Sequence, residues 1–117
     1  MDDVILLTVA RTPDDTRDQL RSLASIRLPG YDKERTERLA GIRAALKWSI
    51  AERDVTPLSG TTRSATPKAV AGQLQVADVL AGTASAVRPY ARGVRAGLLW
   101  LLGENDALDE IGFGPRP

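Results

Sequence analysis

The segment at residues 41–54 reads GIRAALKWSIAERD, and it recurs 52 positions later, at residues 93–106, as GVRAGLLWLLGEND. Both copies keep the glycine, arginine, alanine, leucine, tryptophan, glutamate and aspartate of the pattern. The same offset places the break LPG at residues 28–30 on LAG at residues 80–82. Separate landmarks that recur in the same order indicate an internal repeat.

A helix-start signal appears in both halves of the chain. Thr12 and Thr66, which are 54 positions apart, each offer an N-cap hydroxyl, and each is followed by a proline at the first helical position. These signals predict one helix from about residue 13 to residue 27 and another from about residue 66 to residue 80.

The repeated motif itself lies in two further predicted helices. Asp32 caps a helix that runs to about Arg53, and another helix occupies about residues 84–103, where Pro89 kinks or starts it. Each half of the chain is therefore a helix, a short break and a second helix. Two such diverged hairpins, packed against each other, predict an all-α four-helix arrangement with pseudo-two-fold symmetry.

The whole chain, 1–117, is predicted to form a single domain, because single domains commonly have about 100–150 residues. Its parts are an N-terminal arm at 1–11 that contains the β-prone residues 4–9, a first hairpin at 12–54, a linker at 55–65, a second hairpin at 66–106 and a tail at 107–117. The linker is assigned from its proline, glycine, serine and threonine content, which is typical of turns.

The composition is that of an ordinary globular protein, with 43% hydrophobic residues, 26% charged residues and a net charge of +1. The chain has no cysteine and no histidine, which excludes thiol nucleophiles, disulfides, histidine bases and the commonest zinc and copper ligands. The longest apolar run, at residues 98–102, is far shorter than the roughly 20 residues of a membrane span. Without a secretory signal either, the sequence predicts a cytoplasmic protein with no membrane partner, or a virion protein if a phage encodes it.

Each copy of the repeated motif has two apolar faces when it is wound at 100° per residue. The aliphatic face contains Leu39, Ile42, Leu46 and Ile50 in the first copy and Val94, Leu98 and Leu102 in the second. The opposite face combines small residues with one tryptophan: Gly41, Ala44, Ala45 and Trp48 in the first copy, and Gly93, Ala96, Gly97 and Trp100 in the second.

Small residues let another backbone approach closely, and a tryptophan among them acts as a large anchor. Two interpretations of this face are open. The two tryptophans are buried between the hairpins of one chain, which is the commoner role of a helical tryptophan. Alternatively, these eight residues form a protein interface with another chain, as tryptophan hot spots often do.

Basic residues form a second candidate surface. Arg88, Arg92 and Arg95 share one face of the last predicted helix, and Arg43 and Lys47 lie on the matching face of the second. A phosphate backbone could contact such a track. Because no aromatic residue interleaves with these cations, a solvated face or salt bridges to the acidic segment 104–117 explain them more simply.

The carboxylates do not suggest catalysis. Asp14 and Asp15 fit helix capping, because they lie near the positive end of a helix dipole. Glu52 with Asp54, and Glu104 with Asp106, recur at equivalent places, but no third ligand accompanies them, so no metal site is predicted. The stretch SGTT at residues 59–62 lacks the spaced glycines and the lysine of a phosphate loop. We predict no enzyme and no cofactor.

Two functional hypotheses follow from these surfaces. The first is a non-enzymatic protein–protein interaction or assembly module, which forms a homo-oligomer or a larger assembly, such as a phage virion ring or connector, through its small-residue faces. In this hypothesis the arm at 4–9 adds a strand to a neighbour. The alternative is a small nucleic-acid-binding regulator that uses the arginine and lysine faces. A carboxylate-dependent hydrolase is a third and weaker hypothesis.

Overall fold

A computed structural model of the chain describes residues 11–26, 33–51, 56–60, 65–83, 86–104 and 107–108. Its helices are α2 (Pro13–Ala24), α3 (Lys33–Ser49), α4 (Pro67–Ala81) and α5 (Arg88–Leu101). Over the described residues the protein is all-helical, so the predicted all-α class is confirmed. The predicted arm at residues 4–9, the cap at Asp32 and the end of the tail at 109–117 lie outside the described residues.

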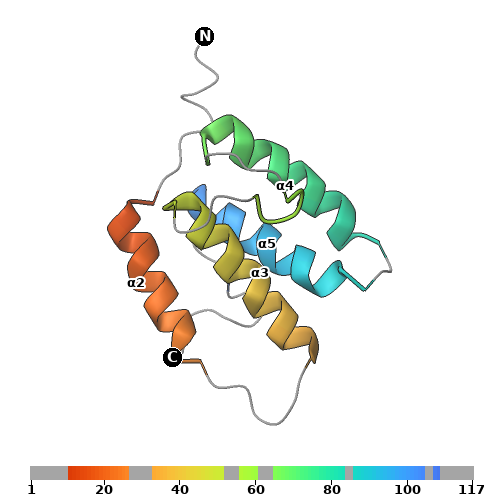
Figure 1. The fold of residues 1–117 in the computed structure, drawn as a ribbon, viewed down its shortest axis with the longest axis horizontal. Helices are drawn as coiled ribbons and strands as arrows, with labels where there is room; N and C mark the ends of the chain where they lie inside the picture. Colours follow the sequence, from red (N-terminus) through yellow and green to blue (C-terminus); the bar gives the residue numbers. More distant parts are fainter. Residues whose placement is uncertain are drawn as a thin grey trace.

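The two helices that carry the repeated motif form the centre of the molecule. α3 packs against α5 over the most extensive contact, α4 packs against α5, and α2 packs against α3 over a smaller contact. In Figure 1, α3 lies in front of α5, α2 lies beside α3 at the left, and α4 lies alongside α5 on the side away from α2. The two outer helices therefore each rest on a different central helix.

The predicted helix starts at Thr12 and Thr66 are confirmed. The Thr12 side chain accepts a hydrogen bond from the Asp15 backbone N–H at 3.0 Å, and the Asp15 carboxylate accepts one from the Thr12 N–H at 3.3 Å. This reciprocal pair is a capping box. The Thr66 hydroxyl accepts from the Ala69 N–H at 3.2 Å. Each threonine satisfies backbone donors that the first helical turn leaves unpaired.

Two of the predicted helix ends are wrong by a few residues, because α2 ends at Ala24 rather than near residue 27 and α3 ends at Ser49 rather than near Arg53. α5 begins at Arg88 rather than near residue 84, which matches the alternative start at Pro89, a proline in the first turn of this helix. The end of α3 has a clear cause, because Ala51 has a φ of 60° and stops the helix. Gly103 holds the equivalent place after α5, with a φ of 107°. There the Glu104 N–H donates back to the Leu99 carbonyl at 3.0 Å and closes the helix end.

The left-handed backbone at these two helix ends gives a paired prediction. A Cβ in this conformation costs roughly 1–2 kcal/mol, so Ala51→Gly should raise the free energy of unfolding by about 1 kcal/mol. Gly103→Ala should lower it by about the same amount. Urea unfolding followed by circular dichroism measures both changes. Shifts of the same sign for the two variants would contradict the equivalence of these helix ends.

The core is built on a close crossing of α3 and α5. A Cβ placed on Gly41 would overlap the Tyr90 backbone carbonyl, and a Cβ placed on Gly93 would overlap the Arg38 carbonyl. One turn further along, a Cβ on Gly97 would lie 2.9 Å from the Ala45 Cβ. The close approach that the small residues predict is therefore present, and the neighbouring backbone belongs to the same chain.

Burial follows the repeat on both central helices. The buried residues of α3 are Gly41, Ile42, Ala44, Ala45, Leu46 and Trp48, and each has a buried counterpart in α5 at an offset of 52: Gly93, Val94, Ala96, Gly97, Leu98 and Trp100. Both faces of the motif are consequently inside the protein. The aliphatic face is completed by Leu39 and Leu102, which are partly buried against the same core.

The glycine crossing predicts that one added methyl group destabilises the fold. Gly93→Ala should lower the free energy of unfolding by about 1–3 kcal/mol, because the methyl group meets the backbone of α3, which cannot move aside alone. Gly72→Ala is the matched control, because Gly72 is exposed in α4 and a Cβ there meets nothing within 4 Å. This control should raise stability by about 1 kcal/mol through helix propensity. Denaturant unfolding of the two variants compares them, and a Gly93→Ala protein as stable as the wild type would exclude the crossing.

Candidate functional site

The eight residues predicted to form a protein interface all lie inside this chain. They are Gly41, Ala44, Ala45 and Trp48 on α3, and Gly93, Ala96, Gly97 and Trp100 on α5. Trp48 is 1% exposed and Trp100 is 8% exposed. The structure therefore matches the interpretation in which both tryptophans are buried within one chain. Contact with another chain through these faces stays a prediction, and it would require α3 and α5 to separate or to exchange between chains.

Arg11 packs over the indole ring of Trp100. Its guanidinium carbon lies 4.2 Å from the centre of the indole ring, in a cation–π contact. Its Nε also donates a hydrogen bond of 2.8 Å to the Trp100 carbonyl, near the C-terminus of α5. The start of α2 is thereby attached to the end of α5. The sequence does not predict this contact, because its two residues are 89 positions apart and neither has a local signal for the other.

The turn at residues 57–59, predicted as part of a linker, is held by two polar side chains. Gln73 on α4 is buried; its Oε1 accepts from the Leu58 N–H at 3.0 Å and its Nε2 donates to the Ser59 hydroxyl at 2.9 Å. The Tyr90 hydroxyl donates to the Pro57 carbonyl at 2.8 Å. These bonds have a structural role, because they satisfy the polar groups of the buried Gln73 and tie the turn to α4 and α5.

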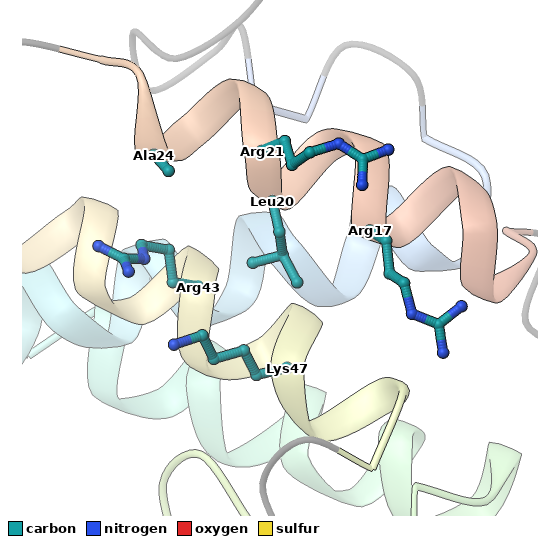
Figure 2. Close-up of a pocket in the computed structure, with 6 residues that line it drawn as sticks. All are labelled: Arg17, Leu20, Arg21, Ala24, Arg43 and Lys47. Atoms are coloured by element: carbon teal, nitrogen blue, oxygen red, sulfur yellow. The ribbon is translucent and has the colours of Figure 1, made fainter.

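An open groove of about 290 Å³ lies between α2 and α3. Its lining is apolar in the middle and positively charged on both sides, and consists of Arg17, Leu20, Arg21 and Ala24 from α2 with Arg43 and Lys47 from α3. In Figure 2, Leu20 points from α2 toward α3. Arg43 and Lys47 extend in the same direction from successive turns of α3. We call this feature the α2–α3 groove.

The two sides of the α2–α3 groove differ in how their charges are paired. On α2, Arg17 forms an ion pair of 3.3 Å with Asp14, and Arg21 pairs with Asp18. Such exposed pairs within one helix contribute about 0.5 kcal/mol or less, so they exchange readily for another carboxylate. On α3, Arg43 and Lys47 have no ion pair with any residue that the structure describes. The α3 side is therefore the stronger attraction for an anion.

The α4–α5 pair shows what the equivalent arginine does when a partner is present. Arg95 occupies the place of Arg43 in the repeat, and its Nε donates to the Asp78 carboxylate on α4 at 2.5 Å. At the offset of 54 that relates Thr12 to Thr66, Asp78 corresponds to Ala24. The first half of the chain thus has an alanine where the second half has the acid that neutralises the arginine.

A second replacement opens the same groove. Leu99 on α5 is partly buried against the core together with Leu74 on α4. At the offset of 52, Leu99 corresponds to Lys47 on α3, and at the offset of 54, Leu74 corresponds to Leu20 on α2. Lys47 and Leu20 both line the α2–α3 groove. A lysine keeps its ammonium group in water and cannot close an apolar contact as leucine does. This replacement is consistent with the smaller contact of α2 on α3 than of α4 on α5.

The structure divides the basic surface predicted from the sequence. Arg43 and Lys47 line the α2–α3 groove, whereas Arg88, Arg92 and Arg95 are not among its lining residues. Arg88 is exposed at the start of α5, Arg92 is partly buried, and Arg95 is paired with α4. The contribution of Arg17 and Arg21 was not predicted, although their spacing of four residues places them on one side of a helix.

Other kinds of site find little support in the part of the chain that the structure describes. It contains no group of three acidic residues placed to hold a metal ion, and Glu52, Asp54 and Asp106 lie outside the described residues. No described helix combines the length and the hydropathy that crossing a membrane requires. Comparisons with known family models, with curated proteins and with solved structures give no match to this chain.

Proposed function

We propose that this protein is a non-enzymatic protein–protein interaction module made of two diverged helical hairpins, and that its first hairpin, α2 with α3, holds the binding surface. The observation that carries the proposal is the α2–α3 groove, in which Arg43 and Lys47 face an apolar floor without a described carboxylate partner. An acidic protein segment would supply the missing charge and cover the floor. Self-assembly, a virion role and the cellular compartment stay predictions.

The contacts at the helix crossing support the proposed pseudo-two-fold arrangement of the two hairpins. Gly41 meets the backbone at Tyr90 and Gly93 meets the backbone at Arg38, and Arg38 and Tyr90 are themselves related by the offset of 52. Such reciprocal contacts are what a two-fold axis between equivalent helices produces. With the hairpins equivalent in this way, a difference between them indicates where one copy has acquired a separate role.

The outer helices support the same equivalence. Thr16 and Leu23 are the buried residues of α2, and the positions 54 residues later, Val70 and Ala77, are both buried in α4. The two outer helices therefore present the same register to the core. The main difference at equivalent positions of these helices is that α2 has Ala24 where α4 has Asp78. Ala24 cannot form the ion pair that Asp78 makes with Arg95, although both positions are helical.

Nucleic-acid binding is the second candidate function, and the cations of the α2–α3 groove favour it. Two features rank it below a protein partner. Asp14 and Asp18 accompany the arginines on the α2 side and would repel phosphates. The lining residues also include no aromatic ring on which a base could stack.

Ala24→Asp tests the proposed function by giving Arg43 the partner that Arg95 already has. Wild-type protein should bind a fluorescent random copolymer of glutamate and leucine at about 50 mM salt, and Ala24→Asp should weaken this binding about tenfold. The fold should persist, because Ala24 is exposed. Ala86→Asp changes the net charge equally at an exposed site that is not in the groove, so it should bind like the wild type. Fluorescence anisotropy measures the affinities.

Two outcomes would overturn the proposal. One is the absence of copolymer binding by the wild type at protein concentrations of about 100 μM, where an affinity near −5.5 kcal/mol would still be seen. The other is equal weakening by Ala24→Asp and Ala86→Asp, which would mean that only net charge matters. Preferential binding of a random duplex DNA, with the same dependence on Ala24, would assign the groove to nucleic acid instead.

A further inference from the structure

Resting on the proposed function, we infer that the partner segment is an acidic amphipathic α-helix that lies in the α2–α3 groove, with its apolar stripe on Leu20 and Ala24 and its carboxylates on Arg43 and Lys47. The inference names the secondary structure and chemistry of the partner. It depends on the arrangement of apolar and charged residues across the groove, and not only on their total charge.

The lining places an apolar strip between two rows of cations. Leu20 and Ala24 are four residues apart on α2 and form the strip. One row is Arg17 and Arg21 on α2, whose side chains extend in different directions in Figure 2, and the other is Arg43 and Lys47 on α3. Each pair is spaced by four residues, so each row and the strip run along a helix axis with one residue per turn. A partner must therefore present an apolar stripe with charges beside it on the same face.

A helix meets this requirement and a strand does not. An amphipathic helix carries an apolar stripe of about 100° with polar residues on its flanks, so its carboxylates can reach toward both rows while the stripe covers the floor. In a strand, residues that flank an apolar side chain point to the opposite face, away from the groove. Helix-in-groove docking is also a common mode of peptide recognition, and its anchors are spaced like Leu20 and Ala24.

The second hairpin already contains the interaction that we infer for the first. Asp78 belongs to a helix that packs alongside α5, and its carboxylate accepts from the Arg95 Nε at 2.5 Å. The partner helix would offer a carboxylate to Arg43 in the same way, from its position alongside α3. The repeat therefore supplies a model of this contact within the protein, with a known donor and a helix-borne acceptor.

The two cationic rows should contribute unequally to binding. The Arg17 and Arg21 guanidinium groups already have carboxylate partners, and Asp14 has a side chain that is 94% exposed and free to swing away. Exchange of one carboxylate for another on this side yields little net energy. Arg43 and Lys47 have no ion pair with a described residue, so an ion pair with the ligand would replace none of the described ones. Most of the charge-dependent affinity should therefore come from α3.

A matched pair of peptides tests the inference. The first is about 18 residues long, so that it can form several helical turns, and places leucines at i, i+4 and i+7 with glutamates on both flanks. The second has the same composition in scrambled order, without a stripe. Isothermal titration calorimetry should show at least tenfold tighter binding of the first peptide, and circular dichroism should show that this peptide gains helix on binding.

Charge removal on α3 locates the binding site. The double variant Arg43→Ala/Lys47→Ala should bind the amphipathic peptide at least tenfold more weakly than the wild type. The double variant Arg88→Ala/Arg92→Ala, which removes the same charge from α5, should lower the affinity less than threefold. Thermal unfolding of both double variants checks that the fold is intact. Equal effects of the two double variants would overturn the assignment to the α2–α3 groove.

The peptide pair separates this inference from the proposed function. If the wild type binds the ordered and scrambled peptides with equal affinity, and the Arg43→Ala/Lys47→Ala variant binds neither, the inference of a helical partner is overturned. The proposed function, an interaction module for acidic protein segments, then stands. Binding of neither peptide would overturn both proposals. Tight binding of the ordered peptide without any gain of helix would also contradict the inference, because an extended ligand would then be the one recognised.

Discussion

The contact on which the rest of the structure depends is the crossing of α3 and α5, where backbone lies against backbone at Gly41 and Gly93. No side chain separates the helices at this point, so the larger residues on either side, including Trp48 and Trp100, close over the crossing and are buried. The outer helices are secondary to it, because α2 packs mainly on α3 and α4 mainly on α5.

This arrangement lets one half of the molecule change without cost to the other. At the α4–α5 contact, Leu74 and Leu99 are partly buried against the core, and Arg95 pairs with Asp78 across the two helices. In the α2–α3 contact, Lys47 and Ala24 stand in the corresponding places, and a basic groove remains open. Since α2 lies away from the glycine crossing, these replacements leave the core intact. This open groove beside a tightly packed core fits the proposed binding role of the first hairpin.

The sequence predicts well whatever depends on neighbouring residues. Thr12 and Thr66 start their helices as expected, because an N-cap is a local interaction. The glycines allow close packing as expected, because a residue without a side chain lets any helix that crosses there come near. The end of α3 was predicted incorrectly because Ala51 adopts a conformation that alanine rarely takes. The groove was predicted only in part. The hairpin of α2 with α3 was expected, and Arg43 and Lys47 were recognised, but the part that Arg17 and Arg21 play depends on how the two helices face each other, which periodicity does not encode.

Native-state hydrogen exchange measured by NMR tests the central claim, that a tight α3–α5 crossing supports a loosely packed α2. The amides of α3 and α5 should exchange only through global unfolding, whereas the amides of α2 should exchange through a local opening of lower free energy. A saturating acidic amphipathic peptide should then slow exchange in α2 more than in α4. Equal exchange free energies in α2 and α3, unaffected by the peptide, would contradict the claim.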